Sequence, residues 1–266
     1  MTCNSESKFI DCRSLCSDGR CATLTTTDEL GGDLRFFSLR HPLSIILCLV
    51  FILGSSVRTG AEPAEPRPRD VLWHIVTTCI DVHKADYCKR CYSPRTDSAC
   101  GHGRACDATT EVWEEATDYI TIRDIKMCGC DKDFVHGLVI PRTRITGVED
   151  PRRPDGIWNF AWAEARKHIQ NDAAIALVVN PANWRSQDQL HVHIVRLLSH
   201  AHRRFSDTTS VRVHSLGSVW HQAANKAARL GLQDYGVLVT KQQEGDFLVQ
   251  VEEKSPEKMY TQWECR

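Results

Sequence analysis

From residue 71 onward, the chain alternates between helical and strand-like spacings of apolar residues. Apolar residues at helical spacing predict helices over 71–84, 157–170 and 218–231. Shorter apolar runs between turn residues predict paired strands at 118–125 with 134–141, 172–180 with 189–197, and 234–242 with 246–253. Each predicted helix precedes one such pair. The pattern therefore predicts an α+β domain, with an antiparallel sheet and helices on one side of it.

Two of the predicted helices carry further signals. Gly231 closes the helix over 218–231, as expected of a C-terminal cap. The helix over 157–170 is amphipathic, and we expect its Trp and Phe side chains to pack in the core rather than bind a ligand.

One apolar run, from Leu43 to Gly54, stands apart from this pattern. It is shorter than the roughly 18–20 residues of a confident membrane span. Basic residues precede it and a Pro-rich segment follows, as is typical of a signal peptide or an uncleaved signal anchor. We therefore expect an extension without regular structure over 1–40, a signal anchor or signal peptide over 41–60, a linker over 61–70 and a folded domain over 71–266.

The charges around this run predict its orientation. Basic residues on its N-terminal side favour the cytosol for that end. We therefore expect a single-pass, membrane-anchored protein whose folded domain lies on the extracytoplasmic, periplasmic face.

Overall composition and charge exclude one class of partner. The chain has 266 residues, of which 42% are hydrophobic and 25% charged, as in ordinary globular proteins. Its formal net charge of −1 lacks the basic bias of nucleic-acid-binding proteins. We therefore expect no nucleic-acid partner.

The cysteines of the predicted domain allow two kinds of chemistry. They are Cys79, Cys88, Cys91, Cys100, Cys106, Cys128, Cys130 and Cys265. An even number in an exported domain favours disulfides. The alternative is a zinc site with thiolates from Cys88, Cys91, Cys128 and Cys130. We expect disulfides, and the spacing leaves their pairing open.

The predicted strand over 189–197 has a polar residue at every second position. Gln189, His191 and His193 therefore share one face of the strand, while the apolar residues between them share the other, buried face. A polar face of this kind can be a solvated surface, a metal site or a catalytic site.

A metal site on this face would need further ligands. His200 and His202 follow nearby, but two arginines come directly after them, and their positive charge disfavours a bound cation. We therefore expect no metal at His191 and His193.

A catalytic interpretation uses more of the surrounding sequence. A neutral imidazole is a good nucleophile toward phosphorus when one ring nitrogen is free and a hydrogen bond holds the other. Polar donors must then meet the phosphoryl oxygens. Candidate donors around His191 are His193, Asn180, Ser186, Gln187, Gln189 and, for charge, Arg185. A hairpin would bring Asn180 and Ser186 beside the imidazole, which predicts a phosphate-binding site.

The segment VVN…RSQDQLHVHI resembles the histidine-triad (HIT) superfamily and, within it, the CDP-diacylglycerol diphosphatase family. The segments IPRTRITGVEDP and WNFAWAEAR are similar to that family in the same order, as is an N-terminal apolar segment followed by a helix ending in Cys. The similarity extends over residues 70–265. It implies a HIT-like antiparallel sheet with flanking helices behind a signal anchor, and it leaves a homodimer possible.

The resemblance implies roles for individual residues. His191 matches the nucleophile, which would take a CMP group as a phosphoramidate. His193 matches the histidine that contacts phosphate and helps to protonate the departing group. Asn180 and Ser186 fall where the superfamily has phosphate-binding side chains.

Two further residues, Arg144 and Gln189, have less certain counterparts in the family pattern. Arg144 matches a basic residue that could meet the distal phosphate. Gln189 replaces the first histidine of the strict pattern, and an amide can donate and accept hydrogen bonds but cannot titrate. This departure leaves the nucleophile intact and puts only a supporting role in doubt.

The implied activity is hydrolysis of the CDP-diacylglycerol diphosphate to CMP and phosphatidate at the membrane surface, without a cofactor. Three alternatives stay open from the sequence. They are a broader nucleotide pyrophosphatase or nucleotidyltransferase of the superfamily, a secreted metal-binding module, and a catalytically inactive relative.

Overall fold

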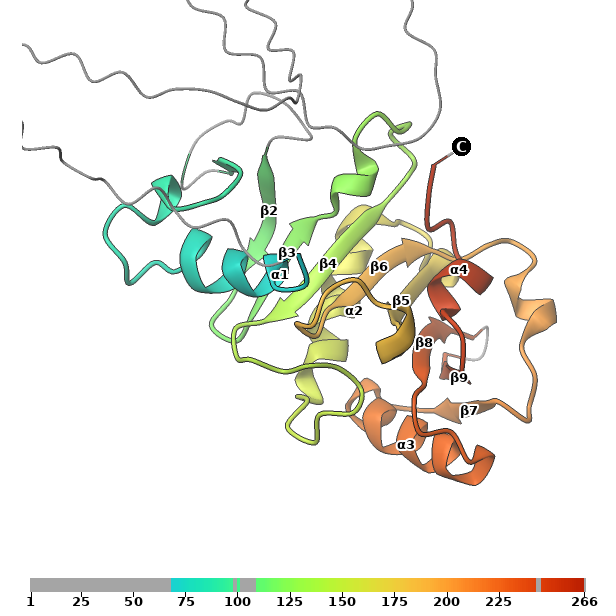
Figure 1. Ribbon diagram of the computed structural model, residues 1–266. Coiled ribbons are helices and arrows are strands. Elements are labelled where there is room, and N and C mark those ends of the chain that lie inside the picture. The colour runs from blue at the N-terminus through green and yellow to red at the C-terminus, as the bar shows by residue number, and fades with distance from the viewer. Residues whose placement is uncertain (1–67, 98–99, 101–108, 243–244, 266) are drawn as a thin grey trace, which may run out of the picture. The chain divides into compact units, whose positions relative to one another are not determined.

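The computed structural model describes residues 68–97, 100, 109–242 and 245–265 (Figure 1). In these residues, nine strands form one sheet in the order β1-β2-β3-β4-β6-β5-β8-β9-β7. The strands are β1 (Arg95–Thr96), β2 (Thr110–Glu115), β3 (Tyr119–Arg123), β4 (His136–Pro141), β5 (Ile175–Val179), β6 (Val192–Arg196), β7 (Ser210–Val213), β8 (Gly236–Lys241) and β9 (Phe247–Glu252). The α-helices are α1 (Val71–His74), α2 (Gly156–His168), α3 (Val219–Leu230) and α4 (Pro256–Tyr260). The predicted α+β class is confirmed.

The predicted strand pairs are also confirmed, as the antiparallel pairs β3–β4, β5–β6 and β8–β9. Two further antiparallel pairings, β4–β6 and β5–β8, join these hairpins into one sheet. Only β1 and β2 pair in parallel among the described strands. The β4–β6 pairing sets Leu138 opposite His193 and brings two distant segments of the chain side by side.

The helices agree with the prediction in two cases out of three. The segments over 157–170 and 218–231 form α2 and α3, and Gly231 closes α3 with a left-handed φ of 71°. The predicted helix over 71–84 is wrong in length. α1 ends at His74 and continues as one π-helical turn, Ile75–Cys79, in a β-branched stretch that disfavours a long α-helix.

The helices cover both faces of the sheet, which corrects the expectation of helices on one side. α2 and α3 pack on one face, where the rings of Trp158 and Trp220 lie 4.7 Å apart between centroids. On the other face, α1 packs on β3 and β4 through Leu72, and α4 packs on β5 and β8. β5 is buried along its whole length, as expected of a strand covered on both faces.

The core confirms the prediction for the aromatic residues of α2. Trp158 is fully buried and Trp162 is 8% exposed, and both belong to the cluster between the sheet, α2 and α3. This cluster packs on one side of the sheet. The polar strand residues discussed below lie on the other side.

The predicted extension over 1–40, the signal anchor over 41–60 and most of the linker over 61–70 lie outside the described residues. Among the helices of the described part, none combines the length and the apolar character that a membrane span requires.

The cysteines form disulfides, as expected. Those between described residues include Cys79–Cys91, Cys88–Cys100 and Cys130–Cys265. The zinc alternative is wrong, because it required free thiolates at residues that these disulfides use. The bond from Cys130 ties the C-terminal segment after α4 to the loop between β3 and β4.

Candidate active site

The polar residues of the β6 segment are buried. Gln189, His191 and His193 expose 0%, 8% and 5% of their surfaces, so this face is not a solvated strand surface. The prediction that the intervening apolar residues are buried is confirmed. β6 begins at Val192, and Gln189 and His191 lie just before it. A strand buried on both faces must satisfy its polar side chains within the protein.

His191 is held in one tautomer by the backbone. Its Nδ1 lies 2.8 Å from the backbone oxygen of Gln189. A carbonyl oxygen can only accept, so Nδ1 carries the proton and donates it. In the neutral ring, this leaves Nε2 with a free lone pair. Burial lowers the pKa of His191 and so favours the neutral ring.

His191 lines a cavity of about 330 Å³ between α1 and the sheet. The apolar part of its lining consists of Val71, Leu72, Ile75, Ile122, Ile125 and Leu138. The polar residues of its lining include Arg123, Asp124, Lys126, Ser186, Gln187 and His193. The cavity can therefore hold a ligand that has both a flat or apolar group and an anionic group.

His193 contacts a second buried histidine, His136 of β4. The Nδ1 atom of His193 and the Nε2 atom of His136 are 2.9 Å apart, and Nδ2 of Asn180 lies 3.4 Å from Nε2 of His193. The ring of His193 also lies across that of His191, with centroids 4.7 Å apart. Sequence reasoning missed His136. Its only local signal was a single histidine in an otherwise apolar strand.

A carboxylate from α4, Glu257, completes this group. One oxygen accepts from Nδ2 of Asn180 at 2.6 Å, and the other accepts from Nζ of Lys126 at 2.8 Å. The hydroxyl of Ser255, at the N-terminus of α4, donates to Oδ1 of Asn180 at 2.7 Å. The side chain of Asn180 is therefore held between α4 and His193, and Asn180 is not among the residues that line the cavity.

The charges of this group follow from burial and mutual contact. Burial lowers the pKa of His193 well below its usual value and also lowers the pKa of His136. Burial opposes ionisation of Glu257, but the nearby histidines and Lys126 lower its pKa overall. Burial thus favours neutral rings for the two histidines, whereas the neighbours of Glu257 favour its ionised carboxylate.

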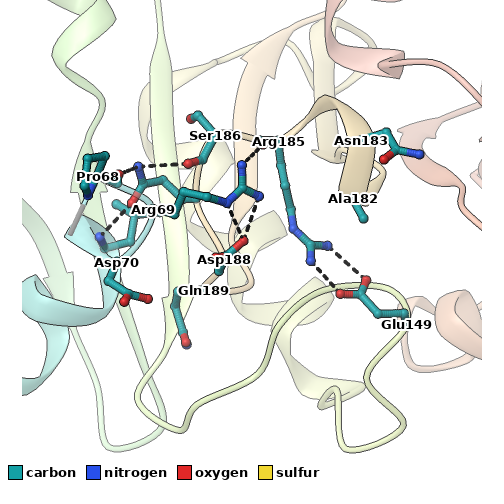
Figure 2. A network of polar contacts seen from close by, with 12 residues as sticks. Pro68, Arg69, Asp70, Glu149, Ala182, Asn183, Arg185, Ser186, Asp188 and Gln189 are labelled. Carbon is teal, nitrogen blue, oxygen red and sulfur yellow. Dashed lines mark hydrogen bonds and ion pairs between the residues drawn. The ribbon is translucent and has the colours of Figure 1, made fainter.

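The loop before His191 is held by the segment that leads into α1, as Figure 2 shows. The guanidinium of Arg69 binds the carboxylate of Asp188 at 2.7 Å and donates to the backbone oxygen of Arg185 at 3.3 Å (Figure 2). These contacts fix the position of the loop that carries Ser186.

Ser186 and Gln187, both predicted as substrate-binding residues, line the cavity. The side-chain amide of Gln187 donates to the backbone oxygen of Pro68 at 2.7 Å and accepts from the backbone N–H of Leu72 at 3.2 Å. Gln187 thus holds α1 against the loop, while Ser186 lines the cavity with His191 and His193.

Two predicted arginines lie elsewhere. Arg185 forms a two-pronged ion pair with Glu149, at 2.9 and 2.5 Å (Figure 2). Arg144 binds the carboxylate of Asp70 at 2.6 Å and lies over the ring of Trp73. Neither is among the residues that line the cavity. The structure therefore places both outside the cavity lining, although, besides burial, the charge of Arg185 contributes to the lowered pKa of His191.

The side chain of Gln189 is engaged with the backbone. Its Nε2 donates to the carbonyl oxygens of Pro141 and Thr143, at 3.0 and 2.8 Å, and its Oε1 accepts from the N–H of Ile145 at 3.4 Å. An amide can make these contacts because it is donor and acceptor at once. Gln189 thus fixes the loop after β4, and only its backbone oxygen contacts His191.

One group of residues has the composition of a metal site. Asp124, His136 and His193 each offer a ligand atom, and these atoms lie within 4.8 Å of one another. However, the nitrogens that would bind an ion share the 2.9 Å hydrogen bond between the two histidines. The residues could hold a divalent cation only in place of that bond.

Comparison with known proteins identifies a family and relatives that this chain resembles. The model of the family "CDP-diacylglycerol pyrophosphatase" matches residues 67–258. A protein of Mycobacterium leprae (strain TN), named "Probable CDP-diacylglycerol pyrophosphatase", is 30% identical over 169 residues, which are 57% of this chain and 53% of that protein. A protein of Mycobacterium tuberculosis (strain ATCC 25618 / H37Rv), with the same name, is 40% identical over 74 residues, or 24% and 28% of the two chains.

The match thus spans about half the length of the Mycobacterium leprae protein. The family model, in contrast, covers most of the described residues and includes all the histidines of the candidate site. The chain belongs to the CDP-diacylglycerol pyrophosphatase family.

Proposed function

We propose that the protein hydrolyses the diphosphate of CDP-diacylglycerol to CMP and phosphatidate, with His191 as nucleophile. The observation that carries the proposal is the hydrogen bond from Nδ1 of His191 to the backbone oxygen of Gln189, because it leaves Nε2 free at the cavity. Membership of the family supports the choice of substrate.

The reaction takes two displacements. The lone pair of His191 Nε2 attacks the cytidylyl phosphorus, and a P–N bond forms while the P–O bond to the distal phosphate breaks. Phosphatidate leaves with the bonding electrons. Water then attacks the same phosphorus, the P–N bond breaks, CMP leaves and a proton is released. Ser186 lines the cavity with His191, so its hydroxyl can meet a phosphoryl oxygen. His193 also lines the cavity, but its ring nitrogens are hydrogen-bonded to His136 and Asn180, and it can meet a phosphoryl oxygen only in place of one of these bonds.

The mixed lining of the cavity suits the nucleoside half of this substrate. Its apolar residues can pack on the flat base, and the carboxylate of Asp124, also in the lining, can accept hydrogen bonds from ribose hydroxyls. The acyl chains must remain outside, because a cavity of about 330 Å³ cannot enclose them.

We further propose that the protein is anchored in a membrane by residues 41–60, with the catalytic domain on the extracytoplasmic side. The apolar run with its basic N-terminal flank supports this location, as do the disulfides of the described residues, because disulfides persist in oxidising compartments. The anchor would keep the enzyme at the surface that holds its lipid substrate. A chain without residues 1–60 should leave the membrane fraction, and retention there would contradict the anchor.

Product analysis tests the function. Wild-type protein and His191→Ala are incubated with CDP-diacylglycerol labelled in the cytidylyl phosphate. We expect labelled CMP from the wild type. The variant should be slower by a factor on the order of 10³ or more, as when a covalent nucleophile is removed. Full activity of His191→Ala would contradict the proposal. Transfer of CMP to an added alcohol in preference to water would instead identify a nucleotidyltransferase.

A further inference from the structure

The proposed substrate carries two negative charges, one on each phosphate, and the cavity needs a cation for the distal one. Charge next to a leaving phosphate stabilises the negative charge that develops there. The arginines expected from the sequence are engaged with Glu149 and Asp70 outside the cavity. A cation in the lining of the cavity must therefore come from another residue.

The described residues that line the cavity include two cations, Arg123 and Lys126. The Arg123 guanidinium is committed to the protein: Nε binds Glu111 at 2.8 Å, Nη1 donates to the backbone oxygen of Asp124 at 3.4 Å, and only 7% of the side chain is exposed. It serves to hold β2, β3 and the following turn together.

Lys126 differs from Arg123 in exposure and in reach. It lies in a short 3-10 turn, Ile125–Met127, and 36% of its side chain is exposed. Its Nζ lies 2.8 Å from Oε1 of Glu257, and the same oxygen lies 3.6 Å from Nδ1 of His193. The ammonium is thus held beside the catalytic histidines, at the end of a flexible four-carbon chain.

We propose that Lys126 binds the distal, lipid-side phosphate of the substrate, and that Glu257 holds its ammonium group beside His193 until the substrate enters. This inference rests on the proposed function, because it assigns the second phosphate of the same reaction. Glu257 keeps its hydrogen bond from Asn180 when the ammonium moves, so the carboxylate does not lose all its partners.

This assignment predicts a selective effect on substrates. A cation at the distal phosphate assists only substrates that have that phosphate. An ester of CMP with p-nitrophenol loses its leaving group from the same cytidylyl phosphorus but carries no second phosphate. The ratio of kcat/KM for CDP-diacylglycerol to kcat/KM for this ester therefore isolates the contribution of Lys126 from that of His191.

The test compares Lys126→Met, Lys126→Arg and the control Lys254→Met, an exposed lysine that does not line the cavity. We expect the ratio to fall on the order of 10²-fold in Lys126→Met, as when one charge-stabilising donor is removed. It should recover in part in Lys126→Arg and stay unchanged in the control. Equal losses on both substrates would overturn the proposal, because they indicate a structural role.

A binding measurement separates this inference from the proposed reaction. The affinities of CDP and CMP are measured by calorimetry on the full chain. Lys126→Met should weaken binding of CDP much more than binding of CMP, and equal effects would contradict the assignment. The double variant Lys126→Met/Glu257→Gln, which leaves no unpaired carboxylate, should show the same selective loss. Wild-type protein that binds CDP more tightly than CMP, but hydrolyses neither CDP-diacylglycerol nor the p-nitrophenyl ester, would contradict the proposed reaction. The contact between Lys126 and the distal phosphate would still be supported.

Discussion

Among single residues, Gln189 has a different task from the one that its place in the pattern suggests. Its side chain satisfies three backbone groups of the loop after β4, and only its backbone oxygen contacts His191. The substitution of glutamine for histidine at this position therefore concerns the stability of the loop. The nucleophile keeps its orientation because a backbone carbonyl does not depend on the side chain.

Gln189→Glu tests this division of tasks. The new carboxylate has the same shape but cannot donate to the carbonyl oxygens of Pro141 and Thr143, which lose their partners. We expect the free energy of unfolding in urea to fall by about 2–4 kcal/mol, the cost of leaving buried groups unpaired. The control Gln233→Glu, at an exposed position, should have almost no effect. Unchanged stability of Gln189→Glu would contradict the assigned role.

The pH dependence of catalysis also belongs to the residue scale. His191 attacks only as the neutral ring, and burial lowers its pKa below the ordinary value of 6.5. The rate constant kcat/KM should therefore persist as the pH falls through 6.5 and decline only at lower pH, where His191 becomes protonated. The decline is measured on the acidic side of the pH profile of kcat/KM. A decline that begins above the ordinary histidine pKa would contradict the burial of a neutral nucleophile.

At the scale of elements, long periodic segments were predictable and short ones were not. α2, α3 and the three hairpins have enough turns or alternations for the period to emerge. β7 has four residues and α4 has five, so neither contains a full pattern. β2, with the sequence TEVWEE, was missed because its charged residues resemble a loop. Both are stabilised by their neighbours: β2 pairs with β3, and α4 packs on β5 and β8.

The contact between β4 and β2 gives a prediction at this scale. Gly137 of β4 faces the indole of Trp113 in β2, and a Cβ at Gly137 would lie 2.3 Å from that ring. The ring cannot move freely, because it stacks on His168 with centroids 3.8 Å apart. Gly137→Ala should lower the free energy of unfolding by about 1–3 kcal/mol through overpacking.

Thermal unfolding with a matched control checks this contact. At Gly217, a new Cβ would meet only the hydroxyl of Ser215 at 3.6 Å, an ordinary distance. Gly217→Ala should therefore change stability by less than about 1 kcal/mol. Equal effects of the two substitutions would show that the indole does not limit the space at Gly137.

On the scale of the whole molecule, the site combines segments that are far apart in the chain. His136, Lys126 and Glu257 meet His193 only because β4 pairs with β6 and α4 covers β5 and β8. The sequence pattern could predict His191, His193 and Ser186, which lie within one hairpin. It could not predict partners that depend on strand order, nor the ion pairs of Arg144 with Asp70 and of Arg185 with Glu149.

The disulfide between Cys130 and Cys265 links two of these segments. It joins residues 135 positions apart, and closing so long a loop restricts the unfolded chain strongly. Replacing both cysteines by serine should lower the free energy of unfolding by about 5 kcal/mol in the chain-entropy model. The matched pair Cys88–Cys100 spans 12 positions and should cost about 3 kcal/mol. Urea unfolding of the full chain measures both, and a larger loss for the shorter loop would contradict the entropic account.

The central claim is that His191 carries the CMP group during turnover. Mixing the protein with CDP-diacylglycerol labelled in the cytidylyl phosphate, quenching within one turnover and mapping the peptides measures this directly. The account predicts one acid-labile cytidylyl group on the peptide that contains His191, and none in His191→Ala. Labelled CMP formed at the full rate without any label on His191 would contradict it.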